Sequence, residues 1–267
     1  MRAGPPPPTV GGTRARPALR CLLLTNPLEV ETRVSVTGAM AQTAGRPDVD
    51  RRLRAGALAF VLAALLTLPV LFVVHPPTDP AHNREFALSA NTFSYRLGWS
   101  LQIYALTPMV LGMFAIYGAL AGTRARRWAL AGLVVTVGGA CLLLPGTGFA
   151  AFVMPAAGVL ISQGHEQDVL RLLDQVFQEP AWIAVFLGGI VHNLGLVVMG
   201  VAVWRSNALP RWAGVLLAAA GVVGLPAFLD ITLAQEIGSA VSVAAFLALA
   251  AGLWQRAAAP VIEGSKA

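Results

Sequence analysis

The sequence predicts an all-α, polytopic membrane protein with six transmembrane helices and one extracytoplasmic amphipathic helix. Two observations predict this fold class. Of the 267 residues, 56% are hydrophobic and only 12% are charged, whereas charged residues make up about 25% of an ordinary soluble domain. The apolar residues also gather in runs close to the roughly 20 residues that a helix needs to cross the hydrocarbon core of a bilayer. Both features indicate that lipid surrounds most of the chain.

Six apolar runs define the predicted spans. They cover residues 55–75, 97–121, 128–145, 181–204, 212–229 and 238–254. Together they form a predicted six-helix transmembrane domain over residues 55–255, which follows a basic tail over residues 1–54 and precedes a short tail over residues 256–267. An even number of spans places the two tails on the same side of the membrane.

Positive charge beside the spans predicts the orientation. Cytoplasmic loops carry an excess of Lys and Arg within about 15–20 residues of the membrane. Most of these residues fall on the side of the two tails, whereas the opposite side carries only Arg84, Arg96 and Arg171. We therefore expect the N- and C-termini to lie in the cytoplasm.

Two arginine clusters flank the first and third predicted spans. Each Arg near an anionic leaflet contributes about 1 kcal/mol of attraction, so both clusters are candidate sites for anionic lipid, although general anchoring of the topology explains them equally well. The arginines form no continuous stripe, so we expect the lipid bilayer and no nucleic acid as a partner. The sequence does not identify a protein partner. The clustered residues are Arg51, Arg52, Arg54, Arg124, Arg126 and Arg127.

The first 54 residues are predicted to be a disordered cytoplasmic tail. They are rich in Pro, Gly and Arg and cannot bury enough apolar area to offset the entropy of ordering. A signal peptide is not expected, because the apolar stretch at residues 21–24 is shorter than the 7–15 residues that such a peptide needs. Translation from Met40 would give a short basic lead into the first span, and the sequence leaves that alternative open.

The region between the third and fourth spans is less regular. Pro145, Gly146 and Gly148 are expected to end the third helix near residue 145, and residues 149–162 have the length of a re-entrant or interfacial piece. Residues 165–180, "HEQDVLRLLDQVFQEP", follow as a predicted amphipathic helix, because Val169, Leu173 and their apolar neighbours recur at helical spacing. Its acidic face makes a cap on the bundle a better prediction than a helix lying on anionic lipid.

The fourth span contains two polar residues, His192 and Asn193. At 100° per residue, they fall on a side of the helix rich in glycine, whereas the opposite side is bulky and aliphatic. Both are therefore predicted to point into the bundle. They would either form hydrogen bonds between helices or line a cavity for a ligand, and ionisable residues at this depth raise the second possibility. Gln102 and Tyr104 on the second span are predicted to line the same cavity, and Thr107, Tyr117 and Thr136 are further possible partners of His192.

No residue pattern indicates catalysis, a metal site or a cofactor. The remaining histidines, His75, His82 and His165, fall at or beyond the outer edge of the spans, so a haem held by two histidines inside the membrane is not expected. No nucleophile–base pair or phosphate-binding loop occurs either. The sequence therefore favours a protein that is not an enzyme.

Two short stretches resemble a known family. The stretches are "WRSNALPRWAG" at residues 204–214 and "FSYRLGW" at residues 93–99. Through them and through its six-span layout, the chain resembles uncharacterised multi-span membrane proteins common in high-GC bacteria, which are grouped as a domain of unknown function. The resemblance covers most of residues 55–254. It implies a bacterial cytoplasmic (inner) membrane location and no particular activity.

Two classes of function remain from the sequence. The first is a helical bundle that acts as a scaffold, sensor or partner subunit without chemistry of its own. The second is a protein that binds or transports a small molecule or ion through a cavity near His192, because broken helices at the middle of a membrane often surround substrate sites. They differ in whether His192 faces a packed contact or a polar cavity.

Overall fold

The computed structural model of the protein describes residues 46–72, 83–225 and 232–259. The chain divides after Pro47, and the helical bundle belongs to the unit that begins at Asp48. Every regular element among the described residues is helical, as the predicted fold class requires. Residues 1–45 of the predicted disordered tail lie outside the described residues.

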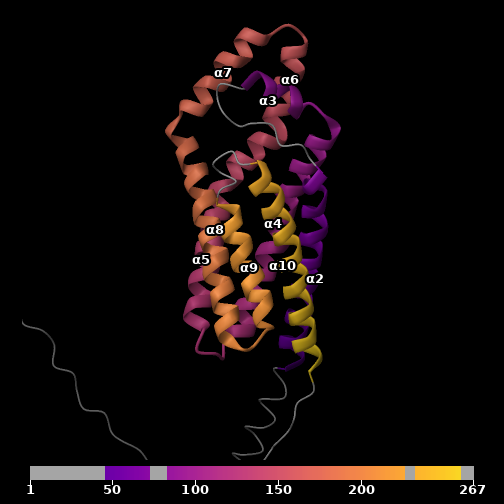
Figure 1. Cartoon of the computed structure of the whole chain (residues 1–267), viewed down its shortest axis with the longest axis vertical. Helices are drawn as coiled ribbons and strands as arrows, with labels where there is room; N and C mark the ends of the chain where they lie inside the picture. Colours follow the sequence, from indigo (N-terminus) through magenta and orange to yellow (C-terminus); the bar gives the residue numbers. More distant parts are fainter. Residues whose placement is uncertain (1–45, 73–82, 226–231, 260–267) are drawn as a thin grey trace, which may run out of the picture. The chain divides into compact units, whose positions relative to one another are not determined.

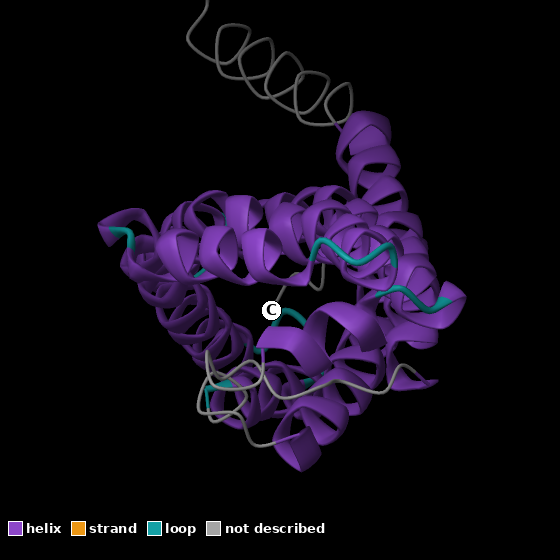
Figure 2. Cartoon of the chain, turned by 90° about the horizontal axis from the view of Figure 1, so that it is seen from above, coloured by secondary structure: helices purple, strands orange, loops and turns teal. Residues whose placement is uncertain are grey.

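Six long helices of the described chain make up the main bundle, and Figure 1 shows them running side by side. Seen from above, they are arranged around a common centre (Figure 2). The bundle helices are α2 (Arg46–Thr67), which continues into the 3-10 helix η1 (Leu68–Phe72), α4 (Phe93–Leu120), α5 (Arg126–Gly148), α8 (Pro180–Ser206), α9 (Arg211–Gly224) and α10 (Thr232–Ala258).

Four helical segments of the described chain are long and apolar enough to cross a membrane. They are Phe93–Leu120, Arg126–Ser162, Pro180–Ser206 and Glu236–Ala258. Arg211–Gly224 is apolar but shorter, and α2 is not among the four. Segments of this length and composition indicate a membrane protein. They correspond to four of the six predicted spans, and residues 73–75 and 226–229 of the other two lie outside the described residues.

The first helix begins earlier than predicted. Residues 46–54 were expected to belong to the disordered tail, but they form the first turns of α2. Pro47 is the second residue of this helix, a position where its missing N–H costs nothing because the first N–H groups of a helix have no partner within it. No further Pro or Gly occurs before Gly56, so the helix extends through the arginine cluster.

Pro145 does not end the third span, and that prediction is wrong. The helix α5 contains Pro145 and continues through a π-helix, η3 (Phe149–Val153), into α6 (Met154–Ser162). Residues 149–162 therefore extend the same helical run and do not form a separate re-entrant piece. Ending a helix in lipid would leave backbone N–H and C=O groups without water, whereas a π turn absorbs the local misalignment within the helix.

A small cap lies at the end of the bundle where α4 and α8 begin (Figure 1). It consists of α3 (Asn83–Ala90), α6, α7 (Glu166–Gln178) and the first turn of α4. The cap has its own apolar core, which includes Phe86, Tyr95, Met154 and Leu173. Two polar contacts join α3 to α7. The Asn83 amide Nδ2 donates to Asp174 Oδ1 at 2.9 Å, and Arg84 Nε lies 2.9 Å from Glu166 Oε1.

The helix α7 corresponds to the predicted amphipathic helix. Val169 and Leu173 are buried, whereas Leu172 is 57% exposed. The buried pair faces the core of the cap, so the apolar side of α7 packs on protein. Exposed ion pairs such as Arg84–Glu166 contribute little to stability, and the apolar core is what holds α7 in place.

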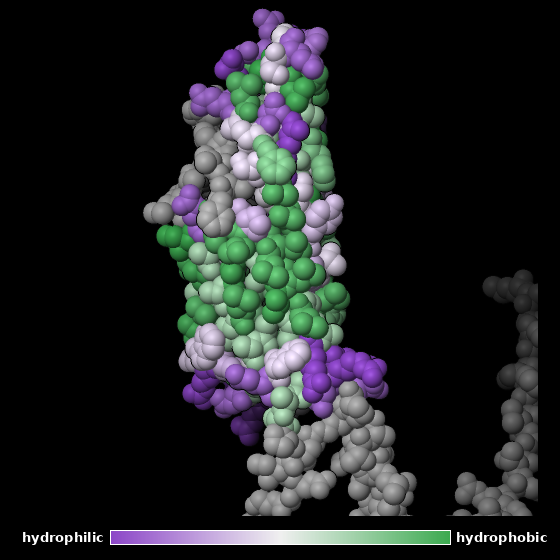
Figure 3. Space-filling model, turned by 90° about the vertical axis from the view of Figure 1, so that its right-hand side faces the viewer, coloured by the Kyte–Doolittle hydropathy of each residue, from purple (hydrophilic) through white to green (hydrophobic). Residues whose placement is uncertain are grey.

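The opposite end of the bundle carries a belt of Trp and Arg residues. Its four tryptophans are all exposed and lie near the start of α5 and α9 and the end of α8 and α10. Arg54 lies over the ring of Trp254 and Arg205 over the ring of Trp128, each with its guanidinium carbon 5.9 Å from the ring centroid. Figure 3 shows this polar belt below a broad apolar band. The tryptophans are Trp128, Trp204, Trp212 and Trp254.

Candidate functional site

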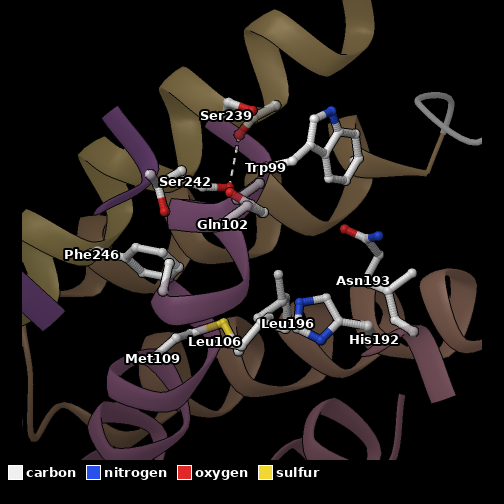
Figure 4. A pocket seen from close by; sticks show the side chains of 16 residues that line it. Trp99, Gln102, Leu106, Met109, His192, Asn193, Leu196, Ser239, Ser242 and Phe246 are labelled. Carbon is white, nitrogen blue, oxygen red and sulfur yellow. Dashed lines mark hydrogen bonds between the residues drawn. The ribbon is translucent and has the colours of Figure 1, made fainter. Parts of the chain in front are cut away.

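A cavity of about 170 Å³ lies inside the bundle, beneath the cap. All six bundle helices contribute to its wall, so the cavity exists only when the whole bundle is assembled. Figure 4 shows the side chains that surround it. Its lining residues are Thr67, Trp99, Gln102, Ala105, Leu106, Met109, Leu143, His192, Asn193, Leu196, Ala220, Gly224, Gly238, Ser239, Ser242 and Phe246.

Three of the four predicted site residues lie in the wall of this cavity. They are Gln102 on α4 and the neighbouring pair His192 and Asn193 on α8. Tyr104 is not part of the lining, and its side chain is 62% exposed. Because Tyr104 lies two residues after Gln102, it projects about 200° further round the helix and therefore to the outer side. The prediction that Tyr104 lines the cavity is wrong for this reason.

The two faces of α8 are placed as the sequence predicted. Bulky aliphatic residues such as Ile183, Leu187 and Leu194 are exposed. The side that carries small and polar residues is buried against α5 and α9. Because these side chains are small, the helix backbones can approach closely. The predicted inward residues, all buried, are Gly188, Gly189, His192, Asn193, Gly195, Leu196, Met199 and Gly200.

The imidazole of His192 has one nitrogen in a packed contact and one left for the cavity. Its Nδ1 lies 3.2 Å from the carbonyl oxygen of Thr136 on α5. A carbonyl oxygen only accepts hydrogen bonds, so Nδ1 carries the hydrogen, and in the neutral ring Nε2 is then an acceptor. His192 therefore satisfies both readings of the sequence, because it bonds to a neighbouring helix and also lines a cavity.

The side chain of Asn193 is oriented in the same way. Its Nδ2 donates to the carbonyl oxygen of Gly189, one turn earlier in α8, at 2.9 Å. This bond directs Oδ1 away from the helix, and Figure 4 shows the oxygen on the cavity side. Gly224 on α9 is packed against this amide, since a Cβ built on Gly224 would lie 2.2 Å from Oδ1. The lack of a side chain at Gly224 thus makes room for Asn193.

Sequence reasoning missed the hydroxyl groups of the cavity. Thr67 Oγ1 donates to the Ala63 carbonyl and Ser242 Oγ to the Gly238 carbonyl, each at 2.8 Å. Ser239 and Ser242 are three residues apart on α10, a spacing that puts them on one face of a helix. This spacing was the available signal in the sequence, but serine is small enough to be common at packed helix interfaces in membranes.

Among the described residues that line the cavity, none has a charged side chain. Groups of three or more His, Cys, Asp or Glu side chains that could hold a metal ion do not occur in the described part of the chain. The wall therefore combines neutral polar groups with apolar surface from Leu106, Met109, Leu196 and Phe246. Such a wall can bind a ligand by shape and hydrogen bonds, without ionic contacts.

A family model described as "Domain of unknown function (DUF4386)" matches residues 54–257. The chain belongs to the DUF4386 family. This match confirms the resemblance to a family of unknown function, and it contains every residue that lines the cavity. Comparisons with curated proteins and with solved structures gave no match. The DUF4386 domain therefore supplies a family and no activity, and the chemistry of the cavity has to be argued from its own residues.

Proposed function

We propose that this DUF4386 protein is a multi-pass protein of the bacterial cytoplasmic membrane that binds a small uncharged molecule in the cavity between its six bundle helices. The cavity carries the proposal, with His192, Asn193 and Gln102 as its ligand-binding residues. Its volume of about 170 Å³ slightly exceeds that of an engineered protein cavity of about 150 Å³ that binds benzene. A molecule built on a single ring therefore matches its size.

The belt of Trp and Arg residues supports the membrane placement. Trp is enriched where a membrane meets water, and Lys and Arg are enriched on the cytoplasmic side. The exposed arginines of this belt include the six that the sequence predicted as candidate sites for anionic lipid. We assign the belt to the cytoplasmic surface, which puts the two termini in the cytoplasm and the cap outside the membrane.

A second aromatic cluster supports the position of the outer boundary. Phe149, Phe177, Trp182 and Phe186 contact one another, with ring centroids of consecutive pairs 4.8 to 6.5 Å apart. Trp182 precedes Trp204 by 22 residues in one helix, and a rise of 1.5 Å per residue separates them by roughly 33 Å. This separation matches a hydrocarbon core of about 30 Å. His192 lies 10 residues after Trp182 and 12 residues before Trp204, so this side of the cavity is close to the middle of the membrane.

Fusion proteins test the proposed orientation. Green fluorescent protein fused after Ala267 is expected to fluoresce, because it folds in the cytoplasm. Alkaline phosphatase inserted at Gly164, the turn between α6 and α7 with φ of 96°, is expected to be active, because it folds only outside the cytoplasm. The reverse pattern of fluorescence and phosphatase activity would contradict the orientation.

Ligand binding is tested with small fluorinated rings. The full chain in lipid nanodiscs is titrated with fluorobenzene, 4-fluoroanisole and 4-fluorophenol, and saturable binding is measured by fluorine NMR. We expect at least one probe to bind saturably to the wild type. Ser239→Phe is expected to abolish that binding, because the added ring would occupy the cavity that Ser239 lines.

The matched control is Ala244→Phe on the same helix. Ala244 is exposed on the outside of the bundle, so its replacement adds the same ring without filling the cavity. Binding should survive in this variant. If no probe binds saturably, or if Ser239→Phe leaves binding unchanged, the binding function is wrong and a scaffold or partner subunit becomes the better assignment.

A further inference from the structure

We infer that the ligand of the cavity is an uncharged amphiphile that donates hydrogen bonds from its polar end, such as a phenol or another single-ring alcohol. This inference rests on the proposed function, because it names the class of molecule that the same cavity would take. The reason is that several hydrogens on the polar side chains of the wall already donate to backbone carbonyls, whereas acceptor atoms of the same side chains face the cavity.

Two acceptor atoms in the wall belong to side chains that already donate an N–H group to a backbone carbonyl. At His192, Nδ1 is directed to the Thr136 carbonyl, which leaves Nε2 with its lone pair. At Asn193, one hydrogen of Nδ2 is directed to the Gly189 carbonyl, and Oδ1 faces the cavity. These two residues are adjacent on α8 and only 9% and 7% exposed. The side of the cavity formed by α8 therefore presents acceptors.

Three more polar side chains add acceptor atoms to the wall, so that acceptors outnumber donors. The hydroxyl hydrogens of Thr67 and Ser242 are bound to carbonyls of their own helices, so their oxygens offer lone pairs. Gln102 Oε1 is buried and has no hydrogen-bond partner among the described residues. The donor groups on the wall are fewer and are the Gln102 amide nitrogen, the Trp99 indole nitrogen and the Ser239 hydroxyl. A buried acceptor without a partner is costly, and a ligand with O–H or N–H groups would relieve that cost.

The rest of the wall favours an apolar body on the ligand. Leu106, Met109, Leu196 and Phe246 lie around the same space (Figure 4). A charged ligand does not match this wall, since its described residues include no charged side chain and an unpaired ion in a low-dielectric site is strongly disfavoured. The combination selects an uncharged ring that bears a hydrogen-bond donor.

The test compares 4-fluorophenol with 4-fluoroanisole, which differ by methylation of the hydroxyl oxygen. Both are titrated into the full chain in nanodiscs, and partition into lipid is subtracted with nanodiscs that contain no protein. We expect 4-fluorophenol to bind at least about tenfold more tightly, because methylation removes the donor and leaves buried acceptors unpaired.

Two variants identify the acceptors. Asn193→Leu and Gln102→Leu each replace an amide by an apolar group of similar size, and each is expected to weaken 4-fluorophenol several-fold while leaving 4-fluoroanisole unchanged. If one variant does not fold, the other still gives the comparison. Equal losses for both probes in these variants would overturn the role of the acceptors.

The two proposals fail in different ways. Equal affinity of the two probes in the wild type, with both lost in Ser239→Phe, would overturn the donor requirement and keep the binding site. Absence of saturable binding for both probes would overturn the proposed function itself. A preference for 4-fluorophenol that survives in Ser239→Phe would place its binding site outside the cavity and overturn the inference.

Discussion

Replacing Gly139 by leucine is expected to destabilise the bundle strongly. Gly139 lies where α5 and α8 touch backbone to backbone, and a Cβ at this position would lie 2.2 Å from the backbone nitrogen of His192 and 2.6 Å from its Cα. Backbone atoms in two packed helices cannot move aside like the end of a side chain. The helices must therefore separate along their length.

The expected loss is about 3 kcal/mol, the upper part of the range measured for overpacked cores. Thermal unfolding of the purified protein in detergent would measure it. The same variant should also lose ligand binding, because His192, which lines the cavity, is on the displaced helix.

Gly138→Leu provides a matched control one residue away. A Cβ on Gly138 meets no atom within 4 Å, so a leucine there would face outward from the bundle. This variant should unfold close to the wild-type temperature, helped slightly by the better helix propensity of leucine. If Gly138→Leu and Gly139→Leu are equally stable, the close approach of α5 and α8 does not exist in the folded protein.

Replacing Gly158 by alanine is expected to loosen the cap. Gly158 on α6 faces α3, and its added Cβ would lie 2.1 Å from the carbonyl oxygen of Ala87. Since Ala87 is fully buried in the core of the cap, α3 must shift as a unit. We expect a loss of about 2 kcal/mol in the stability of the cap, measured as faster hydrogen–deuterium exchange of the α3 and α6 amides.

The control for this change is Gly148→Ala in the same helical run. A Cβ on Gly148 has no neighbour within 4 Å, and alanine is better than glycine in a helix by up to about 1 kcal/mol. The two substitutions are chemically identical and should have effects of opposite sign. Slower exchange in the Gly158→Ala cap would show that α3 and α6 do not pack as closely as described.

The sequence by itself determined the fold class and the inward side of α8. Apolar runs of nearly 20 residues leave few alternatives to membrane helices, because lipid offers no partners for unpaired backbone groups. The positions of Gly188, His192 and Gly195 follow from helical spacing alone, and each is buried as predicted. The amphipathic pattern of α7 was equally readable, since Val169 and Leu173 repeat at the period of a helix.

Tertiary structure alone decided the rest. The continuation of α5 past Pro145 depends on what surrounds the helix, because the cost of a proline is local whereas the cost of unpaired groups in lipid depends on depth. Helical spacing puts Gln102 and Tyr104 on opposite sides of α4, but the sequence did not show which of the two faces inward, because the polar residues of α4 are not confined to one side. The cavity is the clearest case. Its wall comes from six helices far apart in the chain, and only their packing brings Gln102, Asn193 and Ser242 around one space.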